Sequence, residues 1–441
     1  MSDLGLWGPG AELAWWPIIV GAVVNTSCAL LGCLLVLRRL SLLGDAISHS
    51  VLPGIVGAFL IAQFLRQQPF IYLFAGALIG GMLTTFLVET LHRYVGVAED
   101  AGMGVVFTAL FSVGVIMLSN YARDVHLDAT CVLYGEIGTL AFRTTPIFGF
   151  EVPEALPRMI AALAAVVVFL IVLRKELLIA SFDPALATAM GFSSAALHYA
   201  LMGMTAVVTV AAFEAIGSIL VVAMLVVPAA TAHLLTDRLG RMFVWSAVLA
   251  VSASFLGYLF ARRWNTDVAG MMTVAAGAQF ALAVLFAPRH GVVAKAWRTA
   301  ALTIRIAGED VLARHYRGEE TAQRPVLAGT PAVAPPIESG FVALLARRLL
   351  LYRGELKLTS MGTVLTDRGR RAAESLVRAH RLWEAYLVEN FQLPLDHLHE
   401  PAEKIEHFLG PELQQRLAES LPKTDLDPHG REIPKGATPS N

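Results

Sequence analysis

The sequence predicts an all-α polytopic membrane protein with a small, mainly helical cytoplasmic C-terminal domain. Of its 441 residues, 56% are hydrophobic and only 16% are charged, whereas about a quarter of a soluble chain is charged. From Leu13 to about Pro288 the chain is a series of apolar runs, each close to the ~20 residues that a helix needs to cross a bilayer. From Arg289 onward the composition is that of a soluble domain.

We expect about nine membrane spans. Backbone polar groups find no water in lipid, so helices are the economical form of such runs, and the alternation typical of a membrane barrel is missing. The break at 213–217 between the sixth and seventh spans also fits one broken helix. The expected spans are 13–37, 46–65, 70–91, 101–120, 157–173, 197–213, 217–235, 242–261 and 267–288.

Positive charge predicts the orientation, because Lys and Arg gather in cytoplasmic loops. Arg262 and Arg263 oppose the main trend, which places the N-terminus outside the cell membrane and the tail in the cytoplasm. The N-terminus lacks the basic region of a signal peptide. The basic residues that follow the first, fifth, seventh and ninth spans are Arg38, Arg39, Arg174, Lys175, Arg238, Arg241, Arg289, Lys295 and Arg298.

Asp45 and His49 are four residues apart at the start of the second span, so they share one helix face. A carboxylate and an imidazole are costly in an apolar setting, and together they suit a divalent transition metal. This pair predicts a point on an ion pathway. The alternative is that Asp45 caps the helix and His49 bonds a backbone carbonyl. Glu214, at the break after the sixth span, either lines the mouth of the pathway or lies among lipid headgroups.

A second stretch, 181–191, lies on the expected cytoplasmic side. Asp183 followed by Pro184 is typical of a helix start, because the carboxylate caps free N–H groups and proline fits the first turn. We expect a short amphipathic helix that contacts a partner protein.

The tail carries histidine and glutamate at helical spacing. His380 and Glu384 are i and i+4, and Glu403, Glu406 and His407 are i, i+3 and i+4. With His399, these side chains could converge into one or two sites whose oxygen and imidazole donors favour manganese or ferrous iron over structural zinc. The alternative is a solvated, charged helix face. We also expect a strand pair around Leu350–Leu358, with its turn at 352–355.

The stretch 37–54, which contains the block Gly44-Asp45-Ala46-Ile47-Ser48-His49, resembles the permease subunits of zinc/manganese/iron ABC importers. The stretches 181–191 and 215–232 extend this resemblance over about residues 13–288. It implies two permease copies, separate ATPase subunits and an extracellular or periplasmic metal-binding protein. It also makes 183–191, with Asp183, Pro184, Ala187 and Gly191, the helix that docks on the ATPase. No phosphate-binding Gly-x-x-x-x-Gly-Lys-[Ser/Thr] loop occurs in the sequence, so ATP hydrolysis is expected from the partner and the chain itself is not an enzyme.

Residues 350–434 resemble the wing and dimerisation region of the diphtheria-toxin-repressor/manganese-repressor family. The matching runs are Leu358-Thr359-Ser360-Met361-Gly362, Thr366-Asp367-Arg368-Gly369-Arg370, Ala379-His380-Arg381-Leu382, Ala402-Glu403-Lys404-Ile405-Glu406-His407 and Asp427-Pro428-His429-Gly430. The resemblance assigns all six tail residues to metal sites, and glutamate at 403 is the manganese-type choice. Asp310 matches a ligand on the family's first helix, whereas Ala313 stands where manganese-type members have a second carboxylate.

The family's DNA-reading helix should lie just before Tyr352. The prolines at 331–336 break helices, and few side chains after them could read base edges. Specific DNA binding is therefore not expected, and a net charge of −1 gives no general basic field for nucleic acid.

Together these patterns predict a permease subunit for manganese, iron or zinc, fused to a domain that senses the same ion, without an organic cofactor. A membrane-tethered, metal-dependent transcription regulator and a proton- or sodium-driven transporter are the alternatives. The expected domains are a permease at 1–290, a linker with a winged-helix remnant at 291–340, a metal-binding and dimerisation domain at 341–422, and a flexible tail at 423–441.

Overall fold

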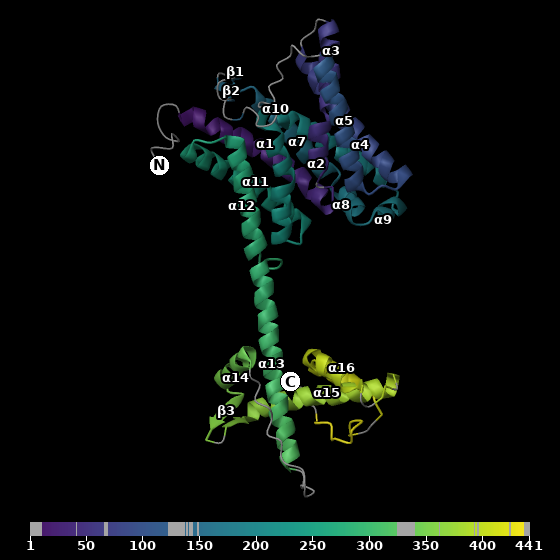
Figure 1. Ribbon diagram of the computed structural model, residues 1–441, viewed down its shortest axis with the longest axis vertical. Helices are drawn as coiled ribbons and strands as arrows, with labels where there is room; N and C mark the ends of the chain where they lie inside the picture. Colours follow the sequence, from purple (N-terminus) through teal and green to yellow (C-terminus); the bar gives the residue numbers. More distant parts are fainter. Residues whose placement is uncertain are drawn as a thin grey trace. The chain divides into compact units, whose positions relative to one another are not determined.

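The computed structural model divides into two compact units, Met1–Ala294 and Lys295–Asn441 (Figure 1). The residues it describes are 11–40, 42–65, 69–121, 137, 140, 144–147, 150–323, 340–360, 362–391, 393–394, 397–422 and 425–435.

The first unit is a helical bundle with one small hairpin. Its helices are α1 (Ala11–Leu37), α2 (Leu43–Ser50), α3 (Leu52–Leu65), α4 (Pro69–Thr90), the π-helical turn η2 (Leu91–Val95), α5 (Glu99–Tyr121), α7 (Ala155–Val172), α8 (Arg174–Phe182), α9 (Pro184–Ala189), α10 (Ser194–Leu235), α11 (Leu239–Trp264) and α12 (Val268–Phe286). The antiparallel strands β1 (Thr144–Ile147) and β2 (Phe150–Pro153) pair with each other.

All nine expected spans correspond to helices. In the described part of the chain, eight helices are long and apolar enough to cross a membrane, and Leu220–Leu235 is a shorter apolar helix. The second span is divided into α2 and α3 at Val51, two residues before Pro53, because proline has no N–H to donate to the preceding helical turn.

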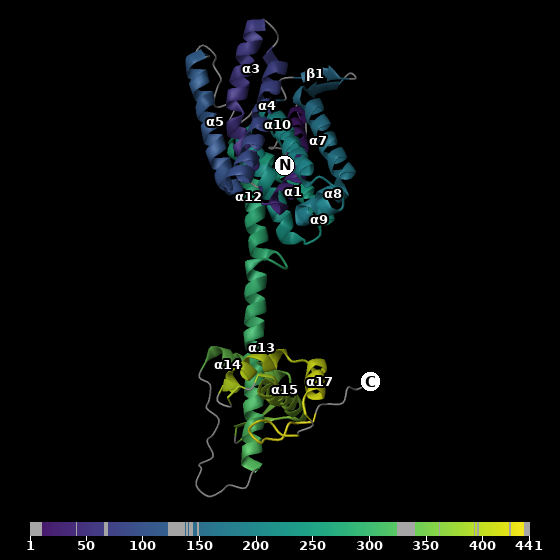
Figure 2. The same ribbon diagram turned by 90° about the vertical axis from the view of Figure 1, so that its right-hand side faces the viewer.

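The core of this unit forms around α1, which packs on α10 and α11. In the most apolar window of α1, 72% of residues are buried, more than in any other span described. On the other side, α3, α4 and α5 run side by side (Figure 2). There, a Cβ added at Gly54 would lie 2.1 Å from the carbonyl oxygen of Gly76, so small residues allow this close approach.

The sixth and seventh expected spans form the single helix α10, broken at Gly217. The φ of 74° and ψ of 165° at Gly217 are accessible essentially to glycine alone. This region is therefore one broken helix, which is the alternative to two separate spans.

The second unit consists of α13 (Val292–Gln323), α14 (Phe341–Tyr352), α15 (Asp367–Phe391), α16 (His399–Ile405), the 3₁₀ turn η5 (Glu406–Phe408) and α17 (Pro411–Ser420), with strands β3 (Leu356–Thr359) and β4 (Gly362–Leu365). Its largest helix after α13 is α15, against which α16, η5 and α17 pack. Leu312, Leu350 and Leu356 form an apolar core that joins α13, α14 and the β3–β4 hairpin.

Three features of the tail differ from their expected form in this unit. The expected linker is helical from 292 to 323, and residues 324–339, with their prolines, lie outside the described residues. The strand pair lies at 356–365, because Gly354, with φ of 69°, ends α14 as a left-handed cap. The expected flexible end is ordered at 425–435, where Leu426 pairs with Glu432.

Candidate metal sites

Asp45 and His49 lie on one face of α2, as their spacing predicts. His49 Nε2 is 3.5 Å from Asp45 Oδ1, and both side chains are about two-fifths exposed, at 42% and 43%. The rings of Phe107 and Phe111, from α5, flank the imidazole at 5.9 and 6.0 Å between centroids. A half-exposed polar pair in a membrane span is costly against lipid, so its surroundings should be a water-filled path or a partner surface.

The other residues expected along the pathway and at the partner contact are placed differently. Glu214 belongs to α10, three residues before the break at Gly217, and its side chain lies outside the described residues. Asp183 caps α9, because its Oδ1 accepts a hydrogen bond of 2.9 Å from the Leu186 N–H, and Gly191 closes the segment with φ of 89°.

Ala187 corrects the expected contact surface of α9. It is completely buried inside its own chain, whereas Leu186 and Met190 are 49% and 55% exposed. The helix makes fewer than two turns, so helical spacing alone could not say which residues face outward. Leu186 of α9 and Met190, the residue that follows the helix, therefore form an exposed apolar surface.

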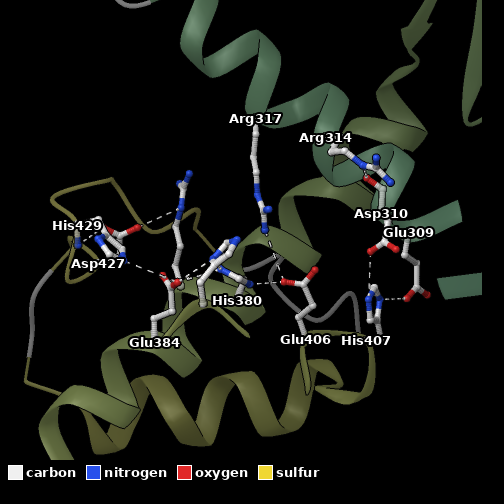
Figure 3. A network of polar contacts seen from close by, with 12 residues as sticks. Glu309, Asp310, Arg314, Arg317, His380, Glu384, Glu406, His407, Asp427 and His429 are labelled. Atoms are coloured by element: carbon white, nitrogen blue, oxygen red, sulfur yellow. Dashed lines mark hydrogen bonds and ion pairs between the residues drawn. The ribbon is translucent and has the colours of Figure 1, made fainter. Parts of the chain in front are cut away.

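In the tail, His380 is the centre of a first cluster of donors. Its Nε2 lies 3.0 Å from Glu384 Oε1 and 2.9 Å from His399 Nδ1. Its Nδ1 contacts Glu406 Oε2 (Figure 3). His380 and Glu384 come from one face of α15, and His399 comes from the first turn of α16.

Burial and ion pairing compete in this cluster. Burial alone would lower the pKa of His380, but its hydrogen bonds to Glu384 and Glu406 outweigh burial and raise the pKa. Burial would likewise raise the pKa of Glu384, yet the hydrogen bond from His380 lowers it. The cluster is thus held together by charge, in a pocket where a cation is favourable.

A second cluster joins Asp310, Glu406 and His407, which offer donor atoms within 4.8 Å of one another. His407 Nε2 is 3.2 Å from Asp310 Oδ1, and its Nδ1 is 2.8 Å from Glu309 Oε2. Burial lowers the pKa of His407, but the hydrogen bonds to Asp310 and Glu309 reverse this effect and raise it to about 9.

Two residues of these clusters were not expected from sequence. Glu309 lies four residues before Ala313, on the same helix face, and so supplies a carboxylate one turn from the position where Ala313 lacks one. His429 Nε2 is 3.9 Å from Glu384 Oε1, and its loop is shaped by Asp427 Oδ1, which accepts hydrogen bonds from the backbone N–H groups of His429 and Arg431. Helical spacing could find neither contact, because both join separate segments.

Glu403 is the expected ligand that lies apart. It is exposed on α16 and belongs to neither donor cluster found among the described residues. The remaining donors are carboxylates and imidazoles, several of them buried, a set that fits a divalent metal ion.

The helix in the DNA-reading position, α14, presents apolar side chains. Phe341, Leu344 and Leu345 are 80%, 52% and 39% exposed. These side chains cannot make the bidentate hydrogen bonds that distinguish bases, whereas Arg348, exposed in the second half of the same helix, has the guanidinium group for such a contact.

Comparison with known proteins gives two family matches. Residues 11–287 match the ABC 3 transport family, and residues 366–435 match the iron dependent repressor, metal binding and dimerisation domain. The manganese transport system membrane protein MntD of Bacillus subtilis is 47% identical over 64% of this chain and 95% of its own length. The zinc transport system membrane protein TroD of Treponema pallidum is 41% identical over 63% of this chain and 74% of its own length.

A solved structure has the same fold. The structure is PsaBC from Streptococcus pneumoniae in complex with Fab. The match covers 65% of this chain and 95% of the PsaBC chain, with a TM-score of 0.53 and 28% sequence identity. The family match covers well over half of the sequence. The chain is therefore a multi-pass membrane permease of the ABC 3 transport family that carries a C-terminal metal-dependent repressor-like domain.

Proposed function

We propose that this permease subunit imports manganese, with iron or zinc as alternative ions, and that its cytoplasmic tail senses the accumulated ion and reduces transport. The observation that carries the proposal is the pair of linked donor clusters in the tail of a permease. Oxygen and imidazole donors without thiolate suit manganese or ferrous iron. The 47% identity to a manganese transport protein supports the same ion.

The ion would pass Asp45 and His49, at the face between two permease copies. The N-terminus would lie outside and the tail in the cytoplasm, because the basic residues follow alternate spans. A metal-binding protein outside would deliver the ion. A separate ATPase subunit would dock on Leu186 of α9 and on Met190, which follows the helix, because both side chains are exposed and apolar.

Sensing would work through pairing of the tails. A ligand shifts an equilibrium only when it binds two states with different affinity. Metal would bind paired tails more tightly than separate ones and so favour one arrangement of the two cytoplasmic faces. A coupling of about 1–3 kcal/mol would reduce transport roughly five- to 150-fold at high internal metal.

The test is the time course of manganese uptake into vesicles that are free of manganese at the start, by the full chain with its ATPase. The double variant Glu406→Ala, His407→Ala should transport at the parent's initial rate but no longer slow as the ion accumulates. Glu403→Ala is the matched control, since Glu403 is exposed and outside both clusters, and it should slow like the parent. Equal slowing of the double variant and the parent would show that the tail does not sense the ion.

A membrane-tethered transcription regulator is the second candidate. The apolar side chains exposed in the first half of α14 count against it, and Arg348 is the exposed arginine of that helix. Binding of the detergent-solubilised full chain to promoter DNA in a gel shift would support this candidate instead.

A further inference from the structure

A cavity of about 400 Å³ lies in the first unit, between segments that are distant in the sequence. It is lined by the C-terminal end of α1, the α4–η2 junction, the α8–α9 junction and the start of α10. Asp45 and His49 do not line it. The cavity is therefore separate from the expected ion pathway and adjoins the helix expected to contact the ATPase.

The charged side chains of this cavity do not balance. Glu89, which is 5% exposed, contacts Arg93 and lies 3.1 Å from His198 Nε2, so its charge is already compensated. Within the described residues, Arg38 and Arg39 form no ion pair with a carboxylate. These two guanidinium groups give the cavity a surplus of positive charge.

The guanidinium group of Arg38 has a free hydrogen-bond donor that an anion could satisfy. Its Nε donates a hydrogen bond of 3.0 Å to Ser181 Oγ, a neutral acceptor. One of its terminal nitrogens is buried and has no hydrogen-bond partner. A buried donor without an acceptor costs roughly 1–3 kcal/mol, a cost that an anionic ligand would remove.

Two backbone irregularities flank the same cavity. Arg39 has φ of 62°, an unfavourable conformation for a residue with a side chain. His92 and Arg93 lie in the π-helical turn η2, a rare form that is frequently found at functional sites. Strained backbone of this kind clusters at ligand-binding sites.

We infer that this cavity binds the phosphate group of an anionic phospholipid. Guanidinium groups bind phosphate oxygens with paired hydrogen bonds, and basic pockets between membrane helices bind acidic lipid headgroups. Phe182, next to Ser181 on α8, is 69% exposed and offers an apolar surface to an acyl chain. The bound lipid links the end of α1 to the segment that carries α9.

Lipid retention by the purified full chain tests this inference. Native mass spectrometry would compare added phosphatidylglycerol with phosphatidylcholine. The parent should retain phosphatidylglycerol, and the double variant Arg38→Gln, Arg39→Gln should retain it at least about tenfold less, as loss of charge-assisted hydrogen bonds predicts. Arg241→Gln is the control, because Arg241 is an exposed arginine at the start of α11 and does not line the cavity.

A further variant separates binding from folding. Arg39→Gly removes the guanidinium group and suits the left-handed backbone at that position, so it should keep the parent's thermal stability and still lose phosphatidylglycerol. Equal retention of the two lipids by the parent, or full retention of phosphatidylglycerol by Arg39→Gly and the double variant, would overturn the inference. Displacement of the lipid by millimolar inorganic phosphate would assign the cavity to a soluble phosphate and would also overturn it.

Discussion

His49 stands between two phenylalanine rings and a carboxylate, and each neighbour affects what the imidazole can do. The rings restrict its orientation, and Asp45 favours a cation at its Nε2, 3.5 Å away. This geometry suits a ligand that holds an ion briefly during passage.

His49→Ala should therefore abolish manganese uptake into vesicles, while the amount of inserted protein stays the same, because one such change does not shorten a span. His233→Ala is the control, since His233 is also exposed in a membrane helix but has no carboxylate at hand in the described part of the chain. Normal uptake by His49→Ala would remove His49 from the pathway.

At His407, metal and proton compete. The pKa of its imidazole is raised to about 9 in the metal-free protein, so the ring is protonated at neutral pH, whereas a metal binds only the neutral ring. Manganese affinity should rise with pH until about 9, by about tenfold per pH unit for each displaced proton. Calorimetry of the full chain in two buffers of different ionisation enthalpy measures the protons released. Glu403→Gln should release as many as the parent, and a pH-independent affinity would contradict the assignment of His407 as a ligand.

At the scale of elements, α9 has an exposed side chain, Leu186, that could contact a partner, next to a buried one, Ala187, that packs inside the permease. Leu186→Arg changes an exposed side chain, so thermal stability should change by no more than about 0.5 kcal/mol, but the charge should prevent docking of the ATPase. ATP hydrolysis should then no longer drive uptake. Ala187→Arg, in contrast, should lower the stability of the permease itself, because Ala187 is fully buried. Coupled transport by a stable Leu186→Arg variant would exclude this face as the ATPase contact.

The break in α10 depends on one residue. Gly217→Ala should destabilise the permease by about 1–3 kcal/mol, because the φ and ψ at this position are closed to residues with a Cβ. Gly277→Ala in α12 is the matched control, since a Cβ there meets nothing within 4 Å and alanine favours a helix. Thermal unfolding in detergent measures both variants, and equal stability would mean that the break is not required.

At the scale of the whole molecule, the permease should work without its tail. A chain ending after Arg298 keeps all the helices of the first unit but loses Asp310 and every later donor. Its uptake should start at the parent's rate and continue without slowing as manganese accumulates. Loss of uptake in a correctly inserted truncated chain would mean instead that the tail is needed for assembly.

The sequence could predict whatever depends on local spacing. Span length places the membrane helices, and the four-residue spacing places His380 beside Glu384, because both follow from helix geometry alone. Contacts between distant segments could not be predicted in this way. His407 meets Glu309 across 98 positions, and His429 reaches Glu384 only because its loop folds back.

Composition also misled at the junction of the two parts. The prolines of 324–340 predict a linker, and that expectation extends back to residue 291, but α13 is helical up to Gln323. Leu312 and Ala313 of α13 are buried against the rest of the second unit, and this burial stabilises a helix that propensity alone would not predict.

Glu406 belongs to both donor clusters, since one of its oxygens contacts His380 while the carboxylate also groups with His407. Metal binding at the two clusters would therefore not be independent. An ion bound in one cluster would neutralise and fix the carboxylate that the other needs, so it would change the affinity of the other cluster for a second ion. For the sensing proposed here, the second ion would meet a shared carboxylate that is already neutralised and a positive charge nearby, so it would bind more weakly than the first, and the response to internal metal would be graded over a wide range of concentration.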